Sequence, residues 1–230
     1  TDDPHSLGVQ DYLFLTIKSP ALLPRLKAMK PLIGKDTTII TCMNGIPHWY
    51  FHKLDNKYAN YKIKCLDPNL LIDAILPPDN IVGSVVYPAC EIVKPGTIKH
   101  IAGNRFSLGE PEGSESARLK FISDILKRAG FRAPIQKNIR DEIWLKLIGN
   151  LSFNPISALT GATLEQICND QGTEAIVRAM MTEAKMIAEE LGAKINMSIE
   201  KRIEGARKVG AHKTSMLQDI EAGKPIEIDS

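Results

Sequence analysis

One lysine and two asparagines recur at intervals of four residues in a mostly apolar stretch of the chain. They are Lys146, Asn150 and Asn154, in the sequence WLKLIGNLSFNPIS at residues 144–157. Residues four apart share a face of a helix, so this spacing predicts that the three polar groups point into one cleft. We expect Asn154 to lie at the helix end, because Pro155 disfavours the helical conformation of the residue before it.

Burying a lysine and two amides in an apolar wall costs on the order of several kcal/mol unless each group finds a partner. A ligand with a carboxylate, carbonyl or hydroxyl group would supply such partners. Alternatively, the lysine reaches solvent along its own stem and the asparagines bond loop backbone. The spacing alone leaves both interpretations open.

Two further segments carry polar side chains that a ligand could use. In TSMLQDIEAGKPIEID, residues 214–229, Ser215 is predicted to cap a helix that Gly223 ends, and Glu227 lies between two isoleucines. Asn44 follows a strand-like run, at the strand end where open α/β sheets bind ligands. Plainer alternatives are a solvated strand position for Glu227 and an ordinary turn at Asn44-Gly45.

The first half of the chain predicts a parallel sheet with crossover helices. Residues 11–18 and 37–43 predict short buried strands, and the amphipathic stretch between them, 20–33, predicts a helix. A helix is also expected over 115–129. Two more strands are expected over 81–93 and 97–108, joined by a turn at Lys94-Pro95-Gly96. Residues 47–78 predict little regular structure.

Helical periodicity replaces strand-like runs from about Arg140 onward. The clearest case is residues 174–191, where one apolar stripe is predicted, made of Ile176, Ala179, Met180, Ala184, Ile187 and Leu191. We therefore expect an α/β domain followed by a helical domain, with the boundary near Asn138.

The composition is that of an ordinary globular protein, with 43% hydrophobic residues, 24% charged residues and a net charge of +2. No block of like charge indicates nucleic-acid binding, and no apolar run has the length of a membrane span. Cys42, Cys65, Cys90 and Cys168 lack metal-ligand spacing, so we expect reduced, mostly buried thiols and no metal site. These features favour a cytoplasmic protein.

Four landmarks in order resemble the ketopantoate reductase (2-dehydropantoate 2-reductase) family. They are DYLFLTIKS, CMNGIP, IWLKLIGNLSFNPISALTG and SMLQDIEAGKPIEID, which together span nearly the whole chain. The resemblance implies NADPH-dependent reduction of 2-dehydropantoate to (R)-pantoate, a step toward pantothenate and coenzyme A. It also implies a Rossmann-like dinucleotide-binding domain followed by an all-helical C-terminal domain, and a possible homodimer.

The resemblance assigns a role to each polar group on the substrate side. Lys146 matches the family's catalytic lysine, which stabilises negative charge on the substrate's C2 oxygen and donates a proton to it. Asn150 and Asn154 match the asparagines that contact substrate. Ser215 matches the serine that holds the substrate carboxylate.

Three residues match the cofactor side of the family's site. Asn44 corresponds to the asparagine beside nicotinamide and substrate. Glu227 corresponds to the glutamate near the cofactor and the catalytic lysine. Lys18 corresponds to a cofactor-side lysine.

The chain departs from the family pattern in one large feature, the absence of a GxGxxG turn that would receive the pyrophosphate. We therefore interpret it as an internal portion of a longer reductase. Residues 1–137 would be a partial Rossmann-like NADP-binding domain, and residues 138–230 a truncated helical domain for substrate binding and catalysis. His212 stands where some members have an asparagine, which leaves the keto acid open.

Two other functions fit the same residues. One is a related hydroxyacid or opine-type dehydrogenase that acts on another 2-keto acid. The other is a non-catalytic NADP-binding protein of the same fold, against which the joint presence of Lys146, Asn150, Ser215 and Glu227 argues.

Overall fold

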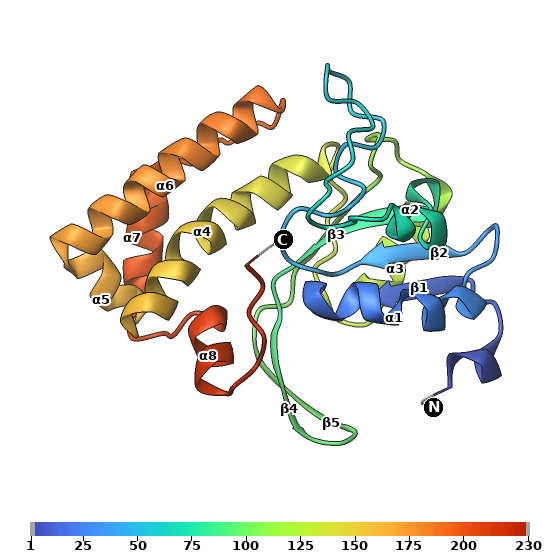
Figure 1. Cartoon of the computed structure of the whole chain (residues 1–230), viewed down its shortest axis with the longest axis horizontal. Helices are drawn as coiled ribbons and strands as arrows, with labels where there is room; N and C mark the ends of the chain where they lie inside the picture. The colour runs from blue at the N-terminus through green and yellow to red at the C-terminus, as the bar shows by residue number, and fades with distance from the viewer. Residues whose placement is uncertain (1–2, 229–230) are drawn as a thin grey trace. The chain divides into compact units, whose positions relative to one another are not determined.

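The computed structural model describes residues 3–228 of the 230-residue chain (Figure 1). The chain forms two compact units, one reaching Glu142 and the other starting at Ile143. Helix α4 (Ile139–Thr160) leads the chain from the first unit into the second.

A four-stranded sheet organises the first unit. Its strands are β1 (Tyr12–Leu15), β2 (Thr38–Thr41), β3 (Ile81–Val86) and β6 (Phe106–Gly109), in this order across the sheet. The first three run parallel, and β6 pairs antiparallel with β3. Helix α3 (Ala117–Arg128) packs Leu119 and Ile122 against Ile40, Val82 and Leu108, which are fully buried on the sheet. The predicted α/β class is confirmed.

The predicted strands differ from the observed ones in length and burial. The run at residues 11–18 was expected to be buried, but only Leu15 is, and Tyr12 and Phe14 are about two-fifths exposed, at 37% and 41%. Each of the two long strands expected over 81–93 and 97–108 divides in two. Their inner parts form a separate hairpin, β4 (Ala89–Lys94) and β5 (Thr97–Ala102). Figure 1 shows this hairpin projecting from the unit as a two-stranded ribbon, turning at the predicted Lys94-Pro95-Gly96.

Short helical segments complete the first unit. They are η1 (Pro4–Leu7), η2 (Ser19–Ala21), α1 (Leu22–Met29), η3 (Lys30–Leu32), α2 (Leu71–Ile75) and η4 (Pro78–Asn80). The stretch 47–78 contains only α2 and the first residue of η4, so it has little regular structure, as expected, and it is held by the buried Arg140. Its Nε donates to the Tyr50 carbonyl at 2.7 Å and its Nη2 to the His52 carbonyl at 2.8 Å. Its Nη1 donates to the carbonyl of Pro111. One guanidinium thus satisfies carbonyls of a segment that has no ladder of its own.

The four cysteines are free thiols, but they are not mostly buried as expected. Cys168 is buried and Cys42 is partly buried, whereas Cys65 and Cys90 are exposed. Cys65 lies in the irregular stretch and Cys90 in the projecting hairpin, where little other structure covers them. Burial raises the pKa of the Cys42 thiol to about 11.

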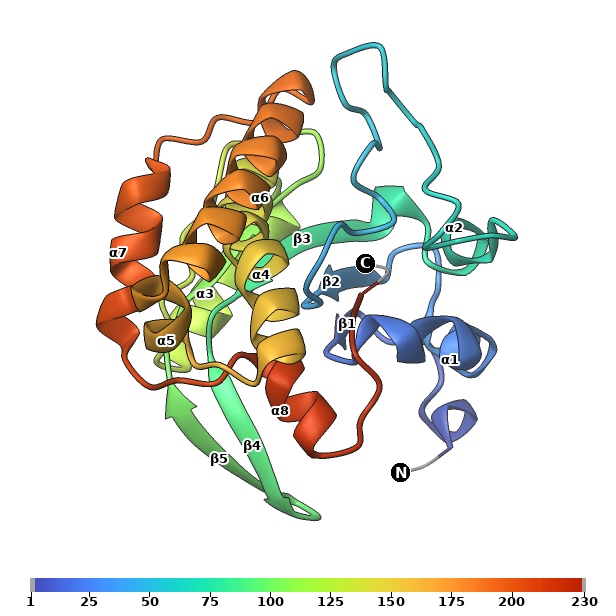
Figure 2. The same cartoon turned by 60° about the vertical axis from the view of Figure 1, so that its left-hand side comes forward.

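Helices make up the second unit. After α4 come α5 (Leu164–Asn169), α6 (Gln171–Glu190), α7 (Ile199–Val209) and α8 (Ser215–Glu221), and no strand occurs in residues 143–228. Side-chain caps begin four of these helices, supplied by Thr163, Asp170, Ser198 and Thr214. Figure 2 shows α4, α6 and α7 gathered into one bundle within this unit.

Three predictions about these helices are wrong. Asn154 does not end a helix, because α4 continues through Pro155 to Thr160. Ser215 is not the cap of α8 but its first residue, and Thr214 accepts the capping bond from the Leu217 amide. The buried stripe of α6 is Val177, Met181, Ala184 and Ala188, which shares only Ala184 with the predicted stripe. Ile176 and Ile187 are about half exposed, at 51% and 48%.

Candidate active site

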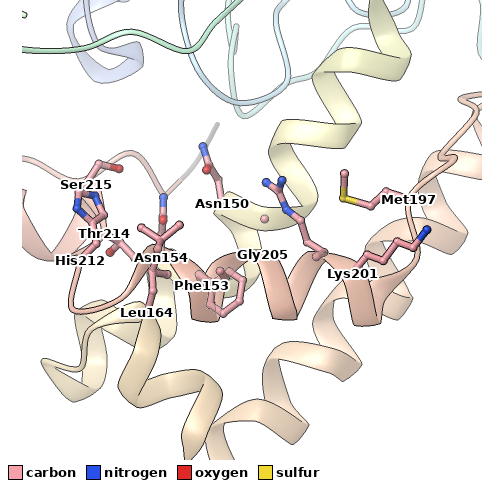
Figure 3. Close-up of a pocket in the computed structure, with 14 residues that line it drawn as sticks. Asn150, Phe153, Asn154, Leu164, Met197, Lys201, Gly205, His212, Thr214 and Ser215 are labelled. Atoms are coloured by element: carbon pink, nitrogen blue, oxygen red, sulfur yellow. The ribbon is translucent and has the colours of Figure 1, made fainter. Parts of the chain in front are cut away.

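A cavity of about 510 Å³ lies within the helical unit (Figure 3). Helix α4 contributes Gly149, Asn150, Phe153 and Asn154, and α7 contributes Lys201, Arg202, Gly205, Ala206 and Val209. The remaining lining residues are Leu164, Met197, His212, Thr214 and Ser215. Its size falls in the range of cavities that bind small molecules.

Helix α4 presents Asn150 and Asn154 to this cavity together. Figure 3 shows both amide side chains projecting from the same side of the helix. The helix is also packed into the core of the unit, because Ile148, Phe153 and Ile156 are each at most 9% exposed. The four-residue spacing therefore does place two of the three predicted polar heads in one hollow.

The segment before α8 brings Ser215 to the same cavity. The amide of Leu164 donates to the carbonyl of His212 at 3.0 Å, which ties the start of α5 to this segment. Thr214 is buried and caps α8, while Met216 and Leu217 anchor the helix in the core. Ser215 and His212 are exposed and face the cavity. Three of the predicted site residues, Asn150, Asn154 and Ser215, thus line one hollow.

Lys146 lies one helical turn before Asn150 and is electrostatically coupled to Glu227. Burial lowers the pKa of the Lys146 ammonium to about 8, and the Glu227 carboxylate partly offsets this by favouring the charged form. The segment of Glu227 has no strand, and this side chain is half-buried rather than solvated. The alternative of a solvated strand position for Glu227 is therefore wrong.

Lys18 and Asn44 belong to the first unit. In the register of β1 and β2, Leu15 pairs with Thr41, and Lys18 and Asn44 each come three residues later. Both residues therefore follow the carboxyl ends of neighbouring parallel strands, the edge at which such sheets bind ligands. Lys18 is exposed and Asn44 half-buried.

Sequence reasoning missed Arg202 and Thr214. Thr214 could have been recognised, because threonine is a preferred cap and stands directly before Ser215. The signal for Arg202 lay elsewhere, in Gly149. A glycine inside a helix leaves room for another group to approach the backbone, and here the guanidinium of Arg202 lies against it.

Family models match most of the chain. The model described as "Ketopantoate reductase PanE/ApbA" matches residues 1–113, and the model described as "Ketopantoate reductase PanE/ApbA C terminal" matches residues 138–230. The chain belongs to the ketopantoate reductase family. The family resemblance of the four sequence landmarks is therefore confirmed.

Individual members of the ketopantoate reductase family agree with this assignment. A 2-dehydropantoate 2-reductase of Mesorhizobium japonicum is 49% identical over 97% of this chain and 69% of its own length. A ketopantoate reductase homologue from Ralstonia solanacearum MolK2 has a structure that matches with a TM-score of 0.94 at 40% identity, over 100% of this chain and 70% of its own. The chain thus spans about two thirds of these ketopantoate reductases.

The fold extends beyond ketopantoate reductases. A D-mandelate dehydrogenase solved with NADH and anilino(oxo)acetate matches with a TM-score of 0.77 at 21% identity, over 96% of this chain and 66% of its own. At this identity the likeness concerns the fold alone.

No helix in residues 3–228 is both long and apolar enough to cross a membrane. The individual roles predicted for Lys146, Asn150, Asn154, Ser215, Asn44, Glu227 and Lys18 stay predictions, as do the domain limits 1–137 and 138–230.

Proposed function

We propose that this protein reduces 2-dehydropantoate to (R)-pantoate with NADPH, and that Lys146 is the general acid. The observation that carries the proposal is the pKa of Lys146, which burial lowers to about 8 beside Glu227. The same helix bears two amides that line a cavity with Ser215. The name of the 49% identical Mesorhizobium japonicum relative supports the reaction.

The chemistry required of the protein is the supply of one proton. When bound, NADPH supplies a hydride to the C2 carbonyl carbon, and the carbonyl electron pair moves to the oxygen. Lys146 donates the proton that this oxygen needs. With a pKa of about 8, its ammonium form outnumbers the amine by about ten to one at pH 7, yet it gives up the proton more readily than an ordinary lysine.

Glu227 and burial act on Lys146 in opposite directions. Burial alone would favour the neutral amine, which cannot act as an acid, and the carboxylate of Glu227 favours the ammonium. We propose that Glu227 serves in this way to keep Lys146 charged at neutral pH. Glu227 thus acts on the reaction through the charge of Lys146.

The cavity residues bind and orient the substrate in this proposal. Asn150 and Asn154 offer amide donors and acceptors to the carbonyl and hydroxyl oxygens, and Ser215 donates its hydroxyl to the substrate carboxylate. Fixed amides that orient the carbonyl raise the rate, because the entropy cost of reaching the reacting geometry is met when the substrate binds.

The residues of the first unit fit a dinucleotide. Lys18 and Asn44 follow adjacent parallel strands at the edge where dinucleotides bind. An exposed lysine suits a phosphate, and an asparagine amide suits a carboxamide or ribose hydroxyl. We propose that these two residues contact NADPH.

The test follows the oxidation of NADPH by its absorbance, in the complete gene product with 2-dehydropantoate, and compares Lys146→Ala with Lys208→Ala. Lys208 is a solvent-facing lysine of α7 with 75% of its side chain exposed, so it controls for loss of charge. We expect turnover to fall by about 10²-fold or more in Lys146→Ala alone, as for a lost general acid.

Other outcomes redirect the assignment. Undiminished turnover in Lys146→Ala would contradict the role of the lysine and leave the reaction standing. No turnover of 2-dehydropantoate, with turnover in a panel of other 2-keto acids, would favour a related hydroxyacid dehydrogenase. NADPH binding without turnover of any keto acid would favour a non-catalytic protein.

We further propose that the protein is a cytoplasmic homodimer. Size-exclusion chromatography with light scattering would test the dimer, and cell fractionation would test the location.

A further inference from the structure

Gly205 stands in the middle of α7, although neither the backbone nor the packing requires a glycine there. Its φ is not in the positive range that favours glycine. A Cβ atom built onto it would meet no atom within 4 Å beyond the neighbouring turns of its own helix. Glycine inside a helix is less favourable than alanine, because it gives up more backbone freedom on folding. The fold therefore gains nothing from the missing side chain.

The absent side chain leaves open space in the cavity of the candidate active site, which Gly205 lines. Gly149, on the other helix of the cavity, is different, because its space is taken by the side chain of Arg202. The substrate 2-dehydropantoate has ten non-hydrogen atoms. Even if each took up the ~30 Å³ of a water molecule in the liquid, the substrate would occupy about 300 Å³. The cavity of about 510 Å³ therefore has more room than the proposed substrate needs.

The cavity has an apolar lining beyond the polar groups that hold the keto acid in the proposed function. Its apolar side chains are those of Phe153, Leu164, Met197, Ala206 and Val209. Figure 3 shows Asn154 and Ser215 on one side of Gly205 and Met197 on the other. A 2-keto acid that is anchored at Asn154 and Ser215 and carries a long side chain would therefore extend that side chain past Gly205.

We propose that Gly205 is a specificity-determining residue, which opens the cavity to 2-keto acids with an aryl side chain as further substrates of this site. The inference rests on the proposed function, because the same carbonyl must be reduced. An aryl ring packs favourably against the ring of Phe153 and the thioether of Met197. Lys201 and Arg202, which also line the cavity, add aliphatic stems and cations, and an aromatic ring is attracted to both kinds of group.

The test compares two substrates that differ only in a phenyl group, 2-oxo-4-phenylbutanoate and 2-oxobutanoate, in the complete gene product with NADPH. We expect the unaltered protein to favour the phenyl substrate by about tenfold or more in kcat/KM, as for a large apolar group that enters a fitting pocket. In Gly205→Leu, whose side chain would occupy the open space, this ratio should fall to within about twofold of unity. Gly205→Ala should give an intermediate ratio.

The matched control is Lys208→Leu, which places the same leucine on α7 outside the described lining of the cavity, where 75% of the side chain is exposed. This control should keep the ratio of the unaltered protein.

Thermal unfolding separates a substrate role of Gly205 from a structural one. Because an added methyl group has open space and alanine favours the helix, Gly205→Ala should unfold at a higher temperature than the unaltered protein. A lower unfolding temperature would mean that the fold needs this glycine, and would overturn the assignment of its space to substrate.

Binding measured without turnover separates this inference from the proposed function. A ligand that binds the folded state raises the unfolding temperature, so 2-oxo-4-phenylbutanoate should raise it more than 2-oxobutanoate does. This difference should vanish in Gly205→Leu. If no keto acid is reduced but the difference in binding is present, the proposed reaction fails and the aryl site stands. Equal handling of the two acids by the unaltered protein, in both assays, would overturn the site, as would a preference that survives in Gly205→Leu.

Discussion

The buried charge of Lys146 should make the protein less stable at neutral pH than a variant that lacks it. In the unfolded chain this lysine has the ordinary pKa of 10.5, and in the folded protein burial lowers it to about 8. The difference corresponds to about 3 kcal/mol of preferential loss of the charged form on folding. This is an upper limit, because the half-buried side chain keeps part of its contact with water.

The sign of the effect follows from proton binding. Below pH 8 both states hold the proton, and the folded state bears the full cost of the buried ammonium. Between pH 8 and 10.5 the folded state releases its proton while the unfolded state keeps it, so the free energy of unfolding rises with pH. Above 10.5 the cost has gone. In Lys146→Met, which has a similar length and no charge, this rise is absent.

The assay is urea unfolding of Lys146→Met and the parent protein from pH 7 to pH 10.5, followed by far-UV circular dichroism. We expect the stability advantage of the variant to shrink by up to about 3 kcal/mol across this range. Comparing the change with pH removes any constant difference in packing. The control is Lys208→Met, which removes an exposed lysine of α7 with 75% of its side chain in solvent, and its difference from the parent should change much less with pH. A difference for Lys146→Met that changes no more than that of the control would refute the buried-charge reasoning.

The remaining predictions concern Glu227 and Arg140. In Glu227→Gln the lowered pKa of Lys146 should fall further below about 8, because the carboxylate that favours the ammonium is gone. The alkaline limb of the kcat/KM profile should then move to lower pH, and an unmoved limb would contradict the coupling. Arg140→Met should lower the free energy of unfolding by about 3 kcal/mol or more, since it leaves carbonyls of Tyr50, His52 and Pro111 without their donor. Urea unfolding measures this, and a loss below about 1 kcal/mol would mean that water replaces the guanidinium.

The sequence was sufficient to predict that Lys146, Asn150 and Asn154 share one helix, because this prediction depends only on the spacing of neighbouring residues. A lysine and two asparagines four residues apart remain on one face of a helix in any fold that keeps the helix. The prediction that the helix ends at Asn154 was wrong because the preference of the residue before a proline is also a local effect, which packing can overcome. A proline inside a helix costs about 3 kcal/mol, and the burial of Ile148, Phe153 and Ile156 along α4 offsets such a cost. Whether such burial exists is decided by residues distant in the sequence.

The missed features depend on contacts that periodicity does not contain. Two apolar stripes about one residue apart are both compatible with the sequence of α6, and packing selects the one that contains Val177, Met181 and Ala188. Arg202 reads as a solvent-facing arginine of an amphipathic helix until Gly149, more than fifty residues earlier, is seen to receive it. A glycine beside a predicted ligand-binding asparagine was the available clue. It identified the place of a close approach, but not the group that makes it.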